Sequence, residues 1–244
     1  MVMVAKKVKR SDGRTYDELR KPYIIKAGVV KRAQGSAMVQ SGKTIVIAAV
    51  YGPKKVIPKH LEDRDKAILR CRYNMITFSV KDRKKPGPDK RSVEISKVIA
   101  NALSRVVLLE EYPRTLIDVD LEVIQADAGT RVAALTAASV ALADAGIAMK
   151  DLMPAVAAGR ANGHILLDLT KEEEDAEDAV DMPFAYIPST GEITLLQMDG
   201  IVSKEEIKEM IALAKKGAEE IYRLQVEALK ERYAALARLS EVVK

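Results

Sequence analysis

The segment GHILLDLTKEEEDAEDAVDMPFAYIPSTGEITLLQMDG, residues 163–200, alternates short apolar runs with polar connections. The runs HILLDL, DMPFAYIP and ITLLQMDG have the length of strands, and Thr190-Gly191 between the last two is a turn signal. A long acidic connection separates the first two runs. The segment therefore predicts a strand, an acidic connection, a strand, a turn and a third strand.

The acidic connection carries seven carboxylates: Glu172, Glu173, Glu174, Asp175, Glu177, Asp178 and Asp181. Such a cluster is often only a solvated loop. Asp181 differs from the others because it stands at the mouth of an apolar strand, directly before Met182 and Pro183. A carboxylate held at the edge of a core can be oriented for metal or proton chemistry. Asp175, six residues earlier, is the predicted second carboxylate of a shared site.

Composition predicts a folded, intracellular protein. The 244 residues are 48% hydrophobic and 31% charged, which permits a sizeable core and argues against disorder. One cysteine excludes an internal disulfide and a cysteine-based zinc site, and two separated histidines argue against a histidine-rich metal site. No apolar run approaches the roughly 20 residues of a membrane-spanning helix, and residues 1–14 lack the apolar core of a signal peptide. We therefore expect a cytoplasmic protein without a membrane segment.

Charge is unevenly distributed along the chain. The net charge is only +5, but lysine and arginine crowd the first hundred residues, whereas the acidic connection lies in the second half. A basic region beside an acidic centre suits a polyanion that is held and then cleaved. The alternative is a surface made soluble by ordinary lysines and arginines.

The remaining elements follow from hydrophobic periodicity and turn residues. A polar arm is expected over residues 1–22, and loops over 52–67 and 81–90. Strands are expected as three runs within 23–51 and over 68–80, 116–127 and 151–161. Helices are expected over 92–112, 130–144 and 203–240, the last as one or two helices opened by a Ser203–Glu206 capping box. The order lacks regular βαβ alternation and predicts one α+β domain over residues 1–244, with a helical region from 203.

Two turns carry residues suited to anions. In Asp127-Ala128-Gly129-Thr130-Arg131 a strand ends and a helix begins, so free backbone N–H groups, a hydroxyl and a guanidinium converge on a pocket for a phosphate-sized anion. The alternative is a threonine cap beside a surface arginine. Lys90-Arg91-Ser92 places a cation and a hydroxyl at the start of a second helix.

Four motifs in order resemble the RNase PH family of exoribonucleases. They are SDGR with AQGSAMVQSGKTIVIAAVYGP, RSVEISKVIANAL, QADAGTRVAALTAASVALADAGI and EDAEDAVDMPFAY. The resemblance extends over about residues 9–225, and it is strongest to the branch of the family found in archaeal exosomes. One departure is that the connection 176–180 lacks a glycine that often precedes the second aspartate in this family.

The resemblance implies an RNase PH domain, related to ribosomal protein S5 domain 2, and 3′-to-5′ phosphorolysis of single-stranded RNA with release of nucleoside diphosphates. The reverse reaction would extend RNA. Inorganic phosphate would be the co-substrate, bound by Arg91, Gly129, Thr130 and Arg131. Asp175 and Asp181 would be the catalytic acids and would hold Mg²⁺.

The resemblance also implies partners. The chain would alternate with a non-catalytic RNase-PH-like subunit in a hexameric ring of three heterodimers, capped by RNA-binding subunits. The loop of residues 59–66, with His60 and Arg64, would line a channel for unpaired RNA. Further contacts to RNA are expected from Lys90, Arg70, Arg72 and Tyr73 by charge and stacking, although the strand position of Tyr73, taken alone, favours a core aromatic.

Three other functions stay open from the sequence. A non-catalytic RNA-binding ring subunit is disfavoured by the paired aspartates, which RNA binding alone does not need. A homohexameric RNase PH that processes tRNA 3′ ends is disfavoured by the long C-terminal helix and the basic N-terminus. A generic phosphate-binding α+β domain is the third.

Overall fold

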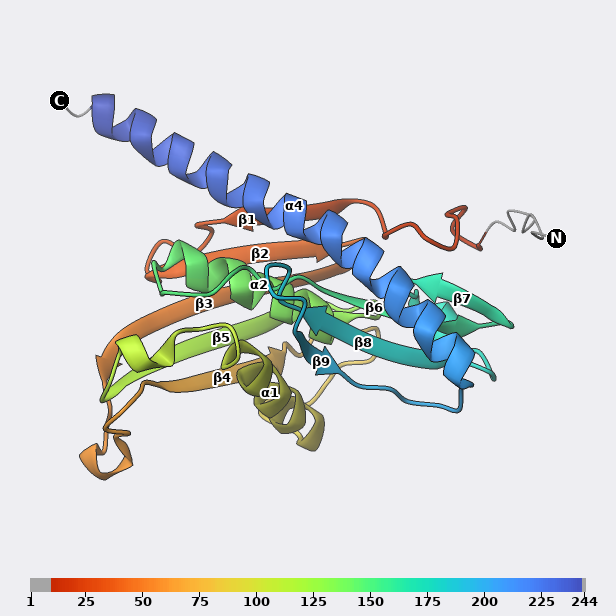
Figure 1. The fold of residues 1–244 in the computed structure, drawn as a ribbon, viewed down its shortest axis with the longest axis horizontal. Coiled ribbons are helices and arrows are strands. Elements are labelled where there is room, and N and C mark those ends of the chain that lie inside the picture. Colours follow the sequence, from red (N-terminus) through yellow and green to blue (C-terminus); the bar gives the residue numbers. More distant parts are fainter. Residues whose placement is uncertain (1–9, 243–244) are drawn as a thin grey trace.

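A computed structural model describes residues 10–242 of the 244-residue chain, with side chains to residue 238. The predicted arm of residues 1–22 therefore lies partly outside the described residues. Two sheets form the body (Figure 1). The larger has the strand order β1-β2-β3-β5-β4, and the smaller has the order β7-β6-β8-β9.

The larger sheet confirms the three antiparallel strands predicted within residues 23–51. These are β1 (Tyr23–Ala27), β2 (Gly35–Ser41) and β3 (Thr44–Lys55). β3 pairs antiparallel with β5 (Thr115–Gln125), which pairs in parallel with β4 (Ile68–Met75). β3 thus runs into the predicted 52–67 loop, which also holds a short 3₁₀ helix, Lys59–Leu61. β4 ends five residues before the predicted strand 68–80 does.

The smaller sheet confirms the strand order predicted for residues 163–200. It consists of β6 (Ala155–Ala161), β7 (His164–Leu167), β8 (Val180–Tyr186) and β9 (Ile193–Leu196), all antiparallel to their neighbours. The acidic connection between β7 and β8 contains one helical turn, α3 (Lys171–Glu174). This turn rotates successive carboxylates to different sides, which a plain loop would not do.

Helix α2 (Thr130–Asp144) lies between the two sheets and is buried on nearly all sides. It has the predicted bounds. Its many alanines allow close packing on both sides: a Cβ on Gly35 of β2 would lie 2.3 Å from the Ala141 carbonyl oxygen. One continuous cluster of buried side chains joins both sheets through this helix, from Val46 in β3 to Phe184 in β8.

Two other helices cover the outside. α4 (Lys204–Val242) is one helix rather than two, and it crosses the front of both sheets, as Figure 1 shows. Ser203 and Glu206 form the predicted capping box at its start, with Ser203 N to Glu206 Oε2 at 2.7 Å. α1 (Lys90–Leu103) packs against β4.

The predicted helix 92–112 was wrong at its C-terminal end. α1 stops at Leu103, and Val107 instead forms a bridge with Met149 while Leu108 N donates to the Ala148 carbonyl at 2.9 Å. A 3₁₀ turn, Leu109–Glu111, follows. The apolar spacing did continue the helical pattern, but pairing with the α2–β6 connection satisfies the backbone and buries the β-branched valines.

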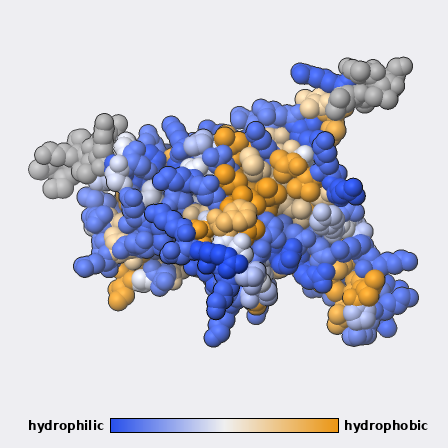
Figure 2. All heavy atoms as spheres, turned by 180° about the vertical axis from the view of Figure 1, so that it is seen from behind, coloured by the Kyte–Doolittle hydropathy of each residue, from blue (hydrophilic) through white to orange (hydrophobic). Residues whose placement is uncertain are grey.

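One face of the larger sheet is covered by none of the helices within residues 10–242. Half-buried Met38 and Ile47, directly opposite each other on β2 and β3, point away from the side chains that pack on α2. Figure 2 shows an apolar area near the middle of the molecule seen from behind. Towards β4 and β5 the same face becomes charged, with Arg70 and Arg72 paired to Asp118 and Asp120.

Candidate active site

The turn before α2 presents backbone N–H groups to one side. Ala128 and Gly129 are both left-handed, with φ of 60° and 59°, and none of the described side chains caps the helix at Gly129. The carbonyls of Asp127 and Ala128 point into the body, where Thr44 Oγ1 lies 2.9 and 2.8 Å away. Since N–H and C=O point in opposite directions in a trans peptide, the N–H groups of Ala128 and Gly129 point out of the body. The alternative interpretation, a threonine cap, is thus not formed.

Glu174 of α3 is the carboxylate that faces this turn. It is half-buried and accepts a backbone hydrogen bond from Gly129. Burial raises the pKa of Glu174, although Lys171, the Gly129 backbone, Arg20 and Arg91 act to lower it. In this structure the carboxylate of Glu174 therefore occupies the position predicted for a phosphate.

Asp181 is a half-buried acid of the site. It is the second residue of β8, and no described group hydrogen-bonds to its buried Oδ1. Burial, together with the charges of Glu174 and Asp199, raises the pKa of Asp181 to about 6, whereas Arg131 and Arg91 act to lower it. Asp181 is therefore able to hold a proton close to neutral pH.

Two arginines supply positive charge. Arg131, at the second residue of α2, donates from Nη1 to Gln197 Oε1, and its Nη2 lies 3.9 Å from Glu94. Its Nε is buried and has no partner among the described groups. Arg91, exposed in the first turn of α1, acts on both Asp181 and Glu174. Hence the structure brings together Arg91, Gly129, Arg131 and Asp181 of the predicted site.

Asp175 is placed differently. Its Oδ1 lies 2.6 Å from Nζ of Lys171 on the same exposed side of α3, and its side chain is 62% exposed. The predicted pairing of Asp175 with Asp181 is not the arrangement seen, because Glu174 occupies that position. The missed signal was the box Thr170-x-x-Glu173, which starts a helical turn and directs Glu173 inward and Asp175 outward. Asp178 caps the β6–β7 turn through Asn162 N and Gly163 N, which agrees with leaving it out of the site.

The predicted stacking of Tyr73 on RNA was wrong, because the residue is buried. Its ring is 2% exposed, and its hydroxyl donates to Thr130 Oγ1 at 2.8 Å. Thr130 is likewise buried, so Tyr73 and Thr130 support the turn from beneath. Side chains alternate along β4, and Arg70 and Arg72 therefore project from the opposite sheet face, where both are exposed but paired to carboxylates of β5.

The second predicted anion site, at residues 90–92, is closed by the chain itself. Asp89 caps α1, with Oδ1 2.7 Å from Ser92 N, and Ser92 returns a hydrogen bond. Hydrogen bonds from Lys84 and the Ser92 backbone lower the pKa of Asp89 to about 2. Ser92 is buried in this cap, whereas Lys90 stays exposed beside it.

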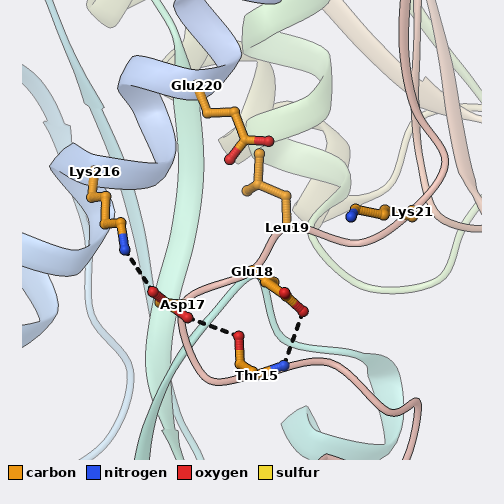
Figure 3. Close-up of a pocket in the computed structure, with 7 residues that line it drawn as sticks. All are labelled: Thr15, Asp17, Glu18, Leu19, Lys21, Lys216 and Glu220. Carbon is orange, nitrogen blue, oxygen red and sulfur yellow. Dashed lines mark hydrogen bonds and ion pairs between the residues drawn. The ribbon is translucent and has the colours of Figure 1, made fainter.

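His60 and Arg64 lie apart from the acids, in the exposed loop after β3. Together with Lys59, Glu62 and Arg114 they line a hollow of about 320 Å³. A second hollow, of about 410 Å³, lies between the N-terminal arm and α4 and contains none of the predicted site residues (Figure 3).

The donors at Asp181 suit Mg²⁺ only in part. Asp181 Oδ1 is an unpartnered carboxylate oxygen, and Glu174 supplies a second carboxylate near it. In the described part of the chain, no cluster of three or more His, Cys, Asp or Glu side chains forms a cage for a metal. Because Mg²⁺ commonly uses one or two carboxylates with water and a substrate phosphate, these residues fit a shared ion better than a resident one.

Comparison with protein families decides the assignment. A family model described as 3′ exoribonuclease family, domain 1, matches residues 19–148, and the model of domain 2 matches residues 151–217. The chain belongs to the RNase PH family. The buried core crosses the boundary between these two matches, and the single-domain interpretation of residues 1–244 stays a prediction.

Similar proteins include components of archaeal exosomes. The chain is 59% identical to the exosome complex component Rrp41 of Thermococcus kodakarensis, over 94% of this chain and 92% of that protein. It is 54% identical to Rrp41 of Archaeoglobus fulgidus, over 92% and 87%. The crystal structure of rice Rrp46 superposes with a TM-score of 0.78 at 28% identity, covering 88% of this chain and 98% of that one. This match confirms the predicted RNase PH fold.

Proposed function

We propose that this RNase PH chain is the catalytic subunit of an archaeal-type exosome and shortens single-stranded RNA from its 3′ end by phosphorolysis. The observation that carries this is the meeting of half-buried Asp181, whose Oδ1 has no partner among the described groups, with an outward-pointing N–H turn and two arginines. The archaeal relatives named Rrp41 support the assignment to an exosome.

The chemistry follows from charge. An oxygen of inorganic phosphate attacks the phosphorus of the terminal phosphodiester, a new P–O bond forms, and the bond to the 3′ oxygen of the preceding nucleotide breaks. Arg91, Arg131 and the N–H groups of the 128–129 turn offset the repulsion between the two anions. Protonated Asp181 is placed to donate to the leaving 3′ oxygen. The products are a nucleoside diphosphate and an RNA one nucleotide shorter; the reverse reaction extends RNA.

Glu174 gives way to phosphate in this scheme, since both are anions that use the same N–H groups. In its ionised form Asp181 would instead hold Mg²⁺ together with Glu174, and the ion would supply positive charge at the phosphate oxygens. A role for Asp175 as a catalytic acid or metal ligand stays a prediction and requires Asp175 to leave Lys171.

A pH shift tests the coupling between Glu174 and Asp181. If protonated Asp181 donates the proton, phosphorolysis falls as pH rises through its pKa of about 6. Glu174→Gln removes a negative charge that raises this pKa, so the fall should move to lower pH. The measurement is kcat/KM for phosphate against pH at saturating RNA, which reports the pKa of Asp181 before phosphate binds. Glu172→Gln, an exposed neighbour on α3, is the control, and an equal shift in both variants would contradict the coupling.

The proposed partners are a non-catalytic RNase-PH-like subunit, forming a hexameric ring of three heterodimers, and RNA-binding caps. RNA would be held by five exposed basic residues: His60, Arg64, Lys90, Arg70 and Arg72. A cytoplasmic location is proposed with the ring. Within residues 10–242, no helix is both long enough and apolar enough to cross a membrane.

The isolated chain is expected to be a poor enzyme. One subunit offers few phosphate contacts, and each lost contact weakens single-strand binding. Mixing with the non-catalytic relative should raise release of nucleoside diphosphate from poly(A) by at least about tenfold at equal subunit concentration. A ring made with the Asp181→Asn chain controls for assembly without catalysis. Full activity of the chain alone, with no gain on mixing, would favour the homohexameric RNase PH that processes tRNA.

A further inference from the structure

Arg20 lies between the two parts of the chain that meet at the active site. It is 4% exposed, and its partners come from the β5–α2 turn on one side and from the end of β7 on the other. These partners fall in the regions matched by the domain 1 and domain 2 family models, respectively.

On the side of β7, Arg20 holds the carboxylate of Asp168 at both oxygens. Arg20 Nη2 donates to Oδ1 at 2.8 Å, and the Arg20 backbone N donates to Oδ2 at 2.9 Å. Ser41 Oγ adds a third hydrogen bond to Oδ2, at 3.1 Å. Asp168 is 2% exposed and has a φ of 52°, an unusual conformation for a residue other than glycine. This pair therefore fixes the guanidinium at the start of the connection that leads to Glu174.

On the side of the turn, the same guanidinium holds backbone carbonyls. Nη1 donates to the Asp127 carbonyl, and Nη2 lies 3.5 Å from the Ala128 carbonyl oxygen. Each held carbonyl sets the direction of the N–H in the same peptide plane, which points the opposite way. Arg20 thus directs the N–H groups of Ala128 and Gly129 towards the position now taken by Glu174.

The guanidinium of Arg20 also lies close to Gly129 itself. A Cβ on Gly129 would lie 2.7 Å from Arg20 Nη2, so the guanidinium is packed directly against the turn. The arm that carries Arg20 is itself anchored, because Asp17 pairs with Lys216 of α4 at 2.5 Å (Figure 3). Arg14 lies six residues before Arg20 in the arm. It donates to the Asp168 carbonyl at 3.1 and 3.2 Å but does not reach the turn at residues 127–129.

We infer that Arg20, fixed by Asp168, is a positioning residue that orients the backbone N–H groups of residues 128 and 129 for the attacking phosphate. The inference rests on the proposed phosphorolysis. It differs from a purely structural role because it assigns the effect of Arg20 to phosphate binding and not to RNA binding or proton transfer.

The test compares Arg20→Gln with Arg14→Gln in the assembled ring. Both variants remove a buried arginine of the arm, but Arg14 leaves the carbonyls of 127 and 128 untouched. Rates of nucleoside diphosphate release from poly(A) are measured against phosphate concentration at saturating RNA. We expect Arg20→Gln to raise the phosphate KM about tenfold, with kcat changed less than about threefold, and Arg14→Gln to leave the phosphate KM within about twofold. Inorganic phosphate should also raise the melting temperature less in Arg20→Gln than in Arg14→Gln.

Arg20→Lys extends the test if the glutamine variant does not fold. Lysine keeps the charge beside Asp168 but lacks the planar fork, so an intermediate phosphate KM is expected. An unchanged phosphate KM in the Arg20 variants, or an equal rise in Arg14→Gln, overturns the inference and leaves phosphorolysis standing. A wild-type ring that releases no nucleoside diphosphate with phosphate would instead refute the proposed function.

Discussion

Asp181→Asn is expected to lower phosphate-dependent release of nucleoside diphosphates by about 100- to 10,000-fold while RNA affinity stays nearly unchanged. Asparagine keeps the size of the side chain but cannot give a proton to the leaving 3′ oxygen. Asp181 is mostly enclosed, and the exposed basic residues that would hold RNA lie elsewhere. The measurements are single-turnover release from poly(A) in the assembled ring and RNA binding by filter retention. Wild-type turnover in this variant would refute the role of Asp181.

The same substitution should stabilise the fold at alkaline pH, which separates lost catalysis from lost structure. The folded-state pKa of Asp181, about 6, lies above the ordinary aspartate pKa of 3.8. Its contribution to stability is therefore complete below pH 3.8 and is lost as pH rises through about 6. Asparagine never acquires the buried charge, so the variant should gain on the order of 2–3 kcal/mol at pH 8. The gain should disappear towards pH 4, and denaturant unfolding at both pH values measures it.

Arg131→Ala is expected to raise the phosphate KM about 10- to 100-fold, because hydrogen bonds from a charged donor to the attacking anion are lost. The guanidinium is only 20% exposed, and it borders the carboxylates through its effect on Asp181. Its link to Gln197 is to a neutral amide, which an incoming phosphate can replace. The measurement is the rate of nucleoside diphosphate release against phosphate concentration.

Arg105→Ala is the matched control for Arg131→Ala. Arg105 is exposed just beyond the C-terminal end of α1, whereas Arg91 of the site lies at the N-terminal end of that helix. Loss of one positive charge there should leave the phosphate KM unchanged. If Arg131→Ala also leaves it unchanged, the 129–131 turn is a structural helix start and not a phosphate site.

The sequence predicted those elements whose pattern and neighbours agree. The alternating runs of β1 to β3 and the alanine-rich α2 have the predicted order, because period and turn residues determine them locally. The C-terminal end of α1 could not be predicted from hydrophobic period and turn residues. Val107 matches a helical face, yet its partner Met149 is more than forty residues away in the sequence, and only the folded chain brings them together.

The candidate site shows the same limit. Asp181 and the 127–131 turn could be identified from local sequence, since an acid before an apolar strand and a glycine before a helix are local signals. Glu174 rather than Asp175 lies beside Asp181 because the connection forms one turn of helix. In such a turn, successive side chains differ in direction by about 100°. Arg20 and Asp168 lie 148 positions apart and carry no local signal of their pairing. Tyr73 had two interpretations from the sequence, an RNA contact and a core aromatic, and its burial shows that it belongs to the core.

The anchoring of the N-terminal arm also governs when an active enzyme first exists during protein synthesis. Arg10 pairs with Glu173, which the ribosome adds 163 residues later. Arg20 pairs with Asp168, which is added 148 residues later. At about 5–20 residues per second, this delay is roughly 8–30 s. Until then the arginines lack these carboxylate partners, Asp181 is not yet made, and only Thr44 holds the carbonyls of the phosphate turn. An incomplete nascent chain therefore carries no assembled nuclease next to the messenger RNA from which it is being translated.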